Sequence, residues 1–158
     1  MQGAASRARA VWQGEGMATD SGQHRRVTVE RIANGRYTAT SAGGAQLTFG
    51  TGGGSEFSPV ELLMAALGGC TAIDVDILTS RRAEPEAFKV VVDAEKVRDD
   101  GGNHLTDIEV RFRLRFPATA QGDAAREILP DVVRKSHDRL CTVSRTIELG
   151  TPISTRVE

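Results

Sequence analysis

Residues 58–78 read SPVELLMAALGGCTAIDVDIL, and this stretch predicts the long helix around which the rest of the chain is organised. Ser58 is a favoured N-cap, Pro59 suits the first helical position, and Glu61 completes a capping box. No residue from 62 to 72 is charged, and apolar side chains surround the helix axis. A helix that is apolar on all sides is normally buried, so we expect it at the centre of the fold.

Composition indicates a soluble protein. The apolar run is too short to span a bilayer, and Glu61, Asp74 and Asp76 flank it. A net charge of -1 gives no reason to expect nucleic acid or a membrane as a partner. Two cysteines, without a charged, apolar and cleavable N-terminus, predict a cytoplasmic protein. An aromatic content of 4% predicts a thin core that favours burial against a second subunit.

The pattern along the chain predicts a single α+β domain at residues 24–158, preceded by a flexible tail at residues 1–23 in which Met17 is a candidate start. Grouped antiparallel strands without regular β-α-β alternation exclude a doubly wound sheet. The expected elements are a hairpin of strands 26–32 and 36–40, a strand at 46–49, the central helix, strands at 88–97 and 105–116, a helix at 123–138, and an edge strand at 147–157.

Two features invite an anion-binding interpretation. The glycine-rich loop at residues 50–55 precedes the helix, but it continues as Ser55-Glu56 where a phosphate-binding loop requires Gly-Lys-Ser/Thr, so we interpret it as a linker. A basic row along one strand, formed by Arg111, Arg113 and Arg115, has acidic residues opposite it at Asp93 and Glu95. We therefore expect solvated cross-strand ion pairs on this face.

Cys70, at the middle of the helix, has several interpretations. A free cysteine is usually a small buried side chain, and an apolar helix raises a thiol pKa unless a cation approaches. A metal site would combine Cys70 and Asp74 with His137 and Cys141, but the chain has no Cys-x-x-Cys pattern, and we expect no metal and no bound cofactor. A redox interpretation needs only a second thiol, Cys141, to resolve a sulfenic acid as a disulfide.

The helix motif and a distant second motif together resemble a known family. The run SPVELLMAALGGC at residues 58–70, followed by His137 and by Cys141-Thr142-Val143-Ser144, is similar to the OsmC/Ohr family of osmotically induced and organic hydroperoxide resistance proteins. The similarity extends over roughly residues 27–158 and is typical of a divergent OsmC-like branch.

The resemblance implies an intertwined homodimer of α+β subunits, with antiparallel sheets packed around buried central helices and active sites at the interface. It also implies a cofactor-free peroxidase of the peroxiredoxin type that reduces organic hydroperoxides in oxidative stress defence. In that scheme Cys70 is the peroxidatic thiol, Cys141 is the resolving thiol, and a dithiol is the reductant. A second hypothesis keeps the fold without the reaction: a non-enzymatic dimer that binds a small apolar ligand or partner at the subunit cleft.

The charges around the thiol depart from the family pattern. Family peroxidases place a glutamate directly after the helix proline, paired with an arginine from the N-terminal strands; here that position is Val60. Glu61 lies nine residues before Cys70, on the opposite helix face, which suits a cap. Arg31 and Arg36 are the candidate arginines. Asp74, one turn beyond Cys70, disfavours a thiolate unless a cation neutralises it.

Overall fold

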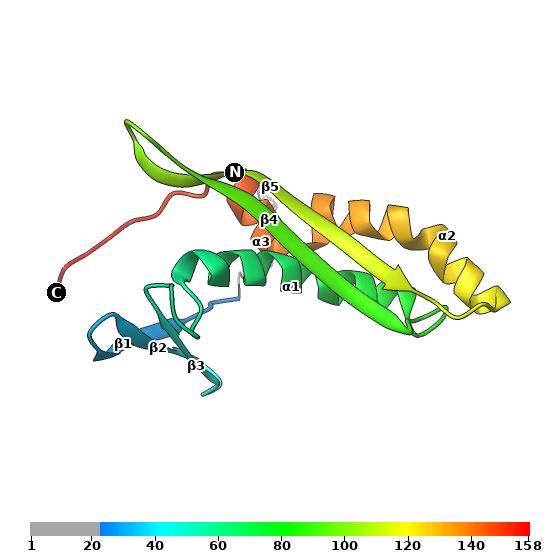
Figure 1. The fold of residues 1–158 in the computed structure, drawn as a ribbon, viewed down its shortest axis with the longest axis horizontal. Coiled ribbons are helices and arrows are strands. Elements are labelled where there is room, and N and C mark those ends of the chain that lie inside the picture. Colours follow the sequence, from blue (N-terminus) through cyan, green and yellow to red (C-terminus); the bar gives the residue numbers. More distant parts are fainter. Residues whose placement is uncertain (1–22) are drawn as a thin grey trace, which may run out of the picture.

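The computed structural model describes residues 23–158, which form an α+β fold of strands and helices arranged around one long helix (Figure 1). The predicted tail therefore lies outside the described residues, apart from Gln23. The elements in chain order are β1 (Val27–Ala33), β2 (Arg36–Ser41), β3 (Gln46–Gly50), α1 (Pro59–Thr79), β4 (Ala87–Asp99), β5 (Gly102–Arg115), α2 (Ala120–Lys135), the π-helical turn η1 (Ser136–Leu140) and α3 (Thr142–Glu148).

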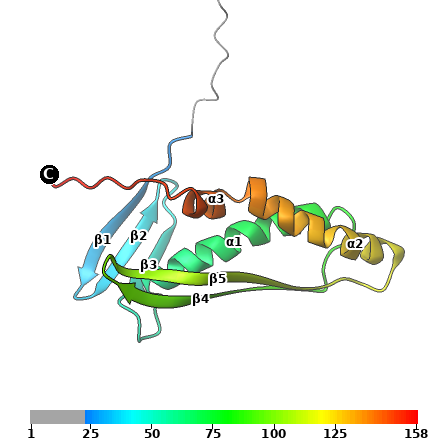
Figure 2. The ribbon, with the colours of Figure 1, turned by 90° about the horizontal axis from the view of Figure 1, so that it is seen from above.

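The strands form two separate antiparallel sheets. One has the order β1-β2-β3, and the other is the long β4–β5 hairpin. As predicted, Asn34-Gly35 makes the β1–β2 turn, where Gly35 has a φ of 68° that suits a residue without a Cβ. Figure 2 shows α1 between the β4–β5 hairpin and the α2–α3 segment, with the three-stranded sheet beside the start of α1. Helix α1 packs against both β4 and α2.

Helix α1 begins as its sequence predicts. The Ser58 Oγ accepts a hydrogen bond from the Glu61 backbone N–H at 3.3 Å, and a Glu61 carboxylate oxygen accepts one from the Ser58 N–H at 2.7 Å. This capping box satisfies two backbone donors that would otherwise lack partners. The pKa of Glu61 is lowered by the Ser58 hydrogen bonds, the backbone bond first. Glu61 is therefore a helix cap in this structure.

A close approach of strand β4 explains one of the two helix glycines. A Cβ on Gly68 would lie 2.8 Å from a methyl carbon of Val92 on β4, whereas a Cβ on Gly69 would have no atom within 4 Å. Real Cβ atoms do not come that close to a neighbouring carbon, so any side chain at position 68 pushes β4 away from α1. Gly68 is the residue that lets the hairpin pack on the central helix.

We expect Gly68→Ala to destabilise the protein despite the higher helix propensity of alanine. The overpacking against Val92 costs about 1–3 kcal/mol, which exceeds the roughly 1 kcal/mol that alanine gains in a helix interior. Chemical denaturation measures the free energy of unfolding. The matched control is Val92→Ala combined with Gly68→Ala, in which the space is restored and the clash is absent. Equal stability of Gly68→Ala and the wild type would contradict the close-packing explanation.

Only one stripe of α1 is buried within the chain. Leu67, Thr71, Val75 and Thr79 are buried, whereas Ile73 and Ile77 are 61% and 53% exposed. The prediction that α1 is buried on all sides therefore holds for only one of its faces in the single chain. Within residues 23–158, α1 is the one helix long and apolar enough to cross a membrane. Because it packs against β4, α2 and α3, we interpret it as the core helix of a soluble fold.

The C-terminal region differs from the prediction. The edge strand expected at residues 147–157 is absent: Thr142–Glu148 is helix α3, and residues 151–158 have no regular structure. Cys141 acts as the N-cap of α3, so the residues that follow it form a helix. A strand would need a neighbour for its backbone hydrogen bonds, and within residues 23–158 neither sheet pairs with this segment. The helix predicted at 123–138 begins earlier, because Thr119 caps it, and ends in η1.

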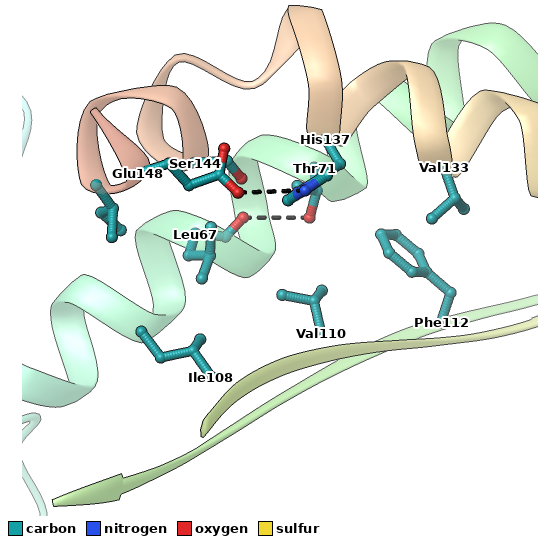
Figure 3. Close-up of a pocket in the computed structure, with 10 residues that line it drawn as sticks. Leu67, Thr71, Ile108, Val110, Phe112, Val133, His137, Ser144 and Glu148 are labelled. Atoms are coloured by element: carbon teal, nitrogen blue, oxygen red, sulfur yellow. Dashed lines mark hydrogen bonds and ion pairs between the residues drawn. The ribbon is translucent and has the colours of Figure 1, made fainter. Parts of the chain in front are cut away.

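The basic row on β5 forms one of the expected cross-strand ion pairs, between Arg111 and Asp93. The expected pairing with Glu95 is not formed among residues 23–158, because Glu95 lies opposite Thr106 and Arg113 lies opposite Lys89. Arg111 pairs with Asp93 on β4 and with Glu109 on its own strand, and Arg115 bonds Glu86 at 3.0 Å. All of these side chains are substantially exposed, so each pair contributes little to stability. The opposite face of β5 carries the apolar residues that point toward the helices (Figure 3).

Candidate functional site

The fold brings the two cysteines together although they are 71 residues apart in the chain. Cys70 lies in the middle of α1, and Cys141 lies between η1 and α3. Both are free thiols, and they are close enough for the two side chains to share a hydrogen bond. Cys70 is partly exposed, whereas Cys141 is fully buried. This pairing of one accessible and one buried thiol is the centre of the candidate site.

The π-helical turn positions Cys141. The Cys141 N–H donates to the Ser136 carbonyl at 2.9 Å, which closes η1, and the chain then leaves the helical conformation at Cys141. From there the Cys141 Sγ accepts a hydrogen bond from the Ser144 N–H at 3.3 Å and caps α3. A π-helical turn is rare and is found frequently at functional sites. Here it turns the second thiol toward α1.

The environment of Cys70 disfavours its thiolate. Burial raises the pKa of the Cys70 thiol, the hydrogen bond and charge of Cys141 raise it further, and so does the charge of Asp74. A hydrogen bond from the Val143 backbone N–H acts in the opposite direction. Among residues 23–158, no cation contributes to the pKa of Cys70. Within one chain, the pKa of Cys70 is therefore higher than that of an ordinary thiol.

The environment of Cys141 favours its thiolate. Burial alone would raise the pKa of Cys141, but hydrogen bonds from the Ser144 side chain, from Cys70 and from the backbone N–H groups of Ser144 and Val143 lower it. Each of these donors stabilises the charged sulfur more than the neutral thiol. The pKa is therefore lowered at the buried sulfur and raised at the accessible one.

We expect Cys141→Ser to lower the pKa of Cys70. The substitution removes the sulfur whose hydrogen bond and charge raise that pKa, while the burial of Cys70 is unchanged. Because iodoacetamide reacts with the thiolate, the pH at which Cys70 reaches half of its maximal alkylation rate should fall. Peptide mass spectrometry measures the rate at Cys70. Ser80→Ala, at the end of α1, is the control, and an unchanged midpoint in Cys141→Ser would mean that the two thiols are not coupled.

The predicted supporting charges fall into two groups. Asp74 is near Cys70, and its charge raises the pKa of that thiol. The Asp74 carboxylate also accepts a hydrogen bond from the Ser136 hydroxyl at 2.8 Å. Glu61 and Arg31 are not brought to the thiols: Glu61 caps α1, and Arg31 lies opposite Tyr37 on the β1–β2 pair. Arg36 is not beside Cys70 either.

Arg36 is held by an acidic residue that the sequence interpretation missed. Its Nε lies 3.1 Å and 3.2 Å from the two Glu56 carboxylate oxygens, and its terminal nitrogen also bonds Glu56. The Arg36 hydrogen bond lowers the pKa of Glu56, and Glu56 raises that of Arg36. The pair lines a polar hollow formed by the β1–β2 turn and the glycine-rich loop. Glu56, noted only as unsuited to phosphate, orients the guanidinium.

A largely apolar cavity of about 300 Å³ lies between α1, β5 and the C-terminal helices (Figure 3). Ser144, which bonds Cys141, and Thr71, which follows Cys70, both line it. A His137–Glu148 ion pair at 3.2 Å lies on its helical side. The apolar part of its lining comes from α1, β5, α2 and α3: Leu67, Ile108, Val110, Phe112, Val133 and Ile147. An apolar group of small-ligand size fits this space.

The residues considered for metal binding are arranged differently. His137 pairs with Glu148 and not with the cysteines. Within residues 23–158, no group of three or more His, Cys, Asp or Glu side chains is placed to hold a metal ion. The donors to the thiols are hydroxyl and backbone N–H groups, which stabilise a thiolate without a metal.

The sequence matches one family profile and uncharacterized mycobacterial proteins. The family profile described as OsmC-like protein matches residues 52–156. An uncharacterized protein of Mycobacterium tuberculosis is 28% identical over 130 residues, which cover 82% of this chain and 93% of the relative. A protein of Mycobacterium bovis, also uncharacterized, has the same identity and coverage.

Solved structures show the same fold. An OsmC-like protein of unknown function from Vibrio cholerae superposes with a TM-score of 0.66 at 14% identity, covering 80% of this chain and 94% of that one. An organic hydroperoxide resistance protein from Elizabethkingia anophelis superposes with a TM-score of 0.54 at 15% identity, covering 81% and 91%. At these identities the similarity establishes the architecture: an α+β fold with antiparallel sheets and a central helix.

Proposed function

The chain belongs to the OsmC-like family, and from this premise we propose that it is a thiol-dependent peroxidase that reduces organic hydroperoxides through Cys70 and Cys141, in stress defence in the cytoplasm. The observation that carries the proposal is the contact between two free thiols, one accessible and one buried. Such a pair supplies both an attacking and a resolving sulfur without a cofactor. The fold shared with the organic hydroperoxide resistance protein supports the substrate class.

Accessibility and charge divide the roles between the thiols. A peroxide reaches Cys70 first, because Cys70 is partly exposed while Cys141 has no exposed surface. The Cys70 sulfur attacks one peroxide oxygen, the O–O bond breaks, and the departing alkoxide becomes an alcohol by taking the Cys70 proton. The Cys141 sulfur, whose pKa is lowered, is the base through which that proton passes.

The second step uses the same contact. Cys70 is now a sulfenic acid, and Cys141 attacks its sulfur, so that an S–S bond forms, the S–O bond breaks, and the oxygen leaves as hydroxide, which takes a proton from the solvent to become water. A dithiol reductant then exchanges with the Cys70–Cys141 disulfide, becomes a disulfide itself and restores both thiols. The buried position of Cys141 protects it from the peroxide during the first step.

A second copy of the chain completes the site in this proposal. Ile73 and Ile77 lie on an exposed apolar stripe of α1, and a homodimer covers it. Among residues 23–158 of one chain, no cation contributes to the pKa of Cys70. Arg36 bonds Glu56 and is not beside the cysteines of the same chain. We propose that Arg36 serves the thiol pair of the other subunit, where its charge stabilises the attacking sulfur.

Peroxide turnover with mass spectrometry of the cysteines tests the proposal. With an organic hydroperoxide and a dithiol, we expect catalytic loss of peroxide, and without the dithiol we expect one Cys70–Cys141 disulfide per chain. If both thiols stay free after treatment and peroxide loss equals the background reaction, the peroxidase proposal is wrong.

The cavity supports a second candidate function. A space of about 300 Å³ with largely apolar walls suits a small apolar ligand, which a non-enzymatic dimer would bind without using the thiols. An environment-sensitive apolar dye should then bind to the wild-type protein. It should not bind to Val110→Phe, a variant in which the larger side chain fills the cavity. Binding in a protein without peroxide turnover favours this function, and turnover without binding excludes it.

A further inference from the structure

A hydrogen bond joins the two cysteine-bearing segments outside the thiols themselves. The Ser136 hydroxyl donates to a carboxylate oxygen of Asp74 at 2.8 Å, across 62 residues of sequence. Ser136 is fully buried, so its hydroxyl depends on this partner and has no water to replace it. Asp74 is only partly buried. The donor of this bond is therefore a buried residue of the η1 turn, and its acceptor is a carboxylate on α1.

Each end of this bond lies one turn from a thiol. Asp74 follows Cys70 by four residues in α1, so both side chains lie on the same helix face. Ser136 begins η1, and its carbonyl accepts the 2.9 Å hydrogen bond from the Cys141 N–H that closes the turn. A short chain of bonds thus runs from α1 through Asp74 and Ser136 to the backbone of Cys141.

The charge of Asp74 opposes a role in activating the thiol. A carboxylate near Cys70 raises the pKa of that thiol and so reduces the thiolate fraction. The same carboxylate satisfies a buried hydroxyl that would otherwise be costly. The contribution of Asp74 to the site is thus geometric.

We propose that Asp74 and Ser136 are positioning residues that clamp the η1 turn onto α1 and thereby hold Cys141 against Cys70 for disulfide formation. The inference rests on the proposed use of these cysteines as a redox pair. Fixing two reacting groups before the bond forms raises the effective concentration of one at the other. Among residues 23–158 no other side-chain hydrogen bond joins η1 to α1, so that without the clamp the two sulfurs spend less time in contact.

The glutathione equilibrium of the full-length protein tests the clamp. Each Cys70–Cys141 disulfide that forms converts one glutathione disulfide into two glutathione thiols, so the equilibrium constant measures the effective concentration of the two thiols. We expect Asp74→Ala and Ser136→Ala each to lower this constant about five- to tenfold, as the loss of one hydrogen bond implies. Asp74→Asn keeps an acceptor oxygen and should stay within about threefold of the wild type.

The control separates the clamp from the charge of the helix. Asp76→Asn removes a carboxylate from the same helix, where Asp76 accepts a hydrogen bond only from Ser80, and it should leave the constant unchanged. If Asp74→Ala and Ser136→Ala lower the melting temperature but leave the constant within twofold of the wild type, the bond is merely structural and the proposal is wrong. Should Ser136→Ala fail to fold, Asp74→Ala against Asp74→Asn carries the test.

The outcome is independent of peroxidase activity, because the assay contains no peroxide. A protein that shows the expected constants and no peroxide turnover supports the clamp and contradicts the proposed reaction. A protein with turnover and unchanged constants in both alanine variants supports the reaction and contradicts the clamp.

Discussion

Cys70→Ser should reduce peroxide turnover to the background rate of hydroperoxide and dithiol without enzyme. In the proposed reaction Cys70 is the thiol that a peroxide reaches, and a serine hydroxyl in this apolar helix is not deprotonated at neutral pH. A coupled assay of hydroperoxide consumption measures the loss. The fold should be retained, because the side chain changes by one atom at a partly exposed position.

Cys141→Ser is the informative companion to that variant. It retains the attacking thiol, so one equivalent of peroxide should still be consumed while turnover stops. With the resolving sulfur gone, Cys70 should accumulate as a sulfenic acid, which dimedone traps and mass spectrometry detects. Full turnover in Cys141→Ser would show that the reductant attacks the Cys70 sulfenic acid directly, and the two-cysteine scheme would be wrong.

Ile77→Asp should convert the proposed dimer into a monomer. Ile77 is 53% exposed in the single chain, so an aspartate there is tolerated by the isolated fold, whereas at a subunit interface it would bury an unpaired charge. The stripe that contains it also carries Ile73, one turn earlier and 61% exposed. We expect dimerisation to weaken by at least about a hundredfold, or about 2.8 kcal/mol. Analytical ultracentrifugation measures the association constant.

The same variant tests whether the partner subunit contributes to the site. If Arg36 of one chain serves the thiols of the other, monomeric Ile77→Asp should lose peroxide turnover with both cysteines intact. Ile77→Leu is the matched control and should keep both the dimer and the activity. A wild-type protein that sediments as a monomer, or a monomeric variant with full turnover, would contradict the proposed dimeric site.

The central helix was predictable because its signals are local. Ser58, Pro59 and Glu61 lie within one turn of each other, and their capping interactions depend on backbone geometry that any helix start shares. The reason for a glycine at position 68, the close approach of Val92, came from the structure. The alternation along β5 required nothing beyond the two-residue period of a strand. The family assignment followed from motifs on these elements.

The C-terminal region was not predictable in the same way. Residues 147–157 carry apolar residues that suit either a strand or a short helix, and no local signal decides between them. The outcome depends on Cys141, which leaves η1 in an extended conformation and caps α3. A π-helical turn has no known sequence period, so the position of the second thiol had to come from the structure.

By itself, the sequence determined the start and length of α1, the two cysteines as the candidate reactive groups, and the family to which the chain belongs. Only the tertiary structure decided that Glu56 holds Arg36, that no cation of residues 23–158 acts on Cys70, and that the pKa of the buried Cys141 is lowered. It also revealed that Ser136 bonds Asp74. The physical reason is that capping and periodicity act between near neighbours in the chain, whereas burial, ion pairing and the pKa of a thiol depend on groups that folding brings together from distant segments.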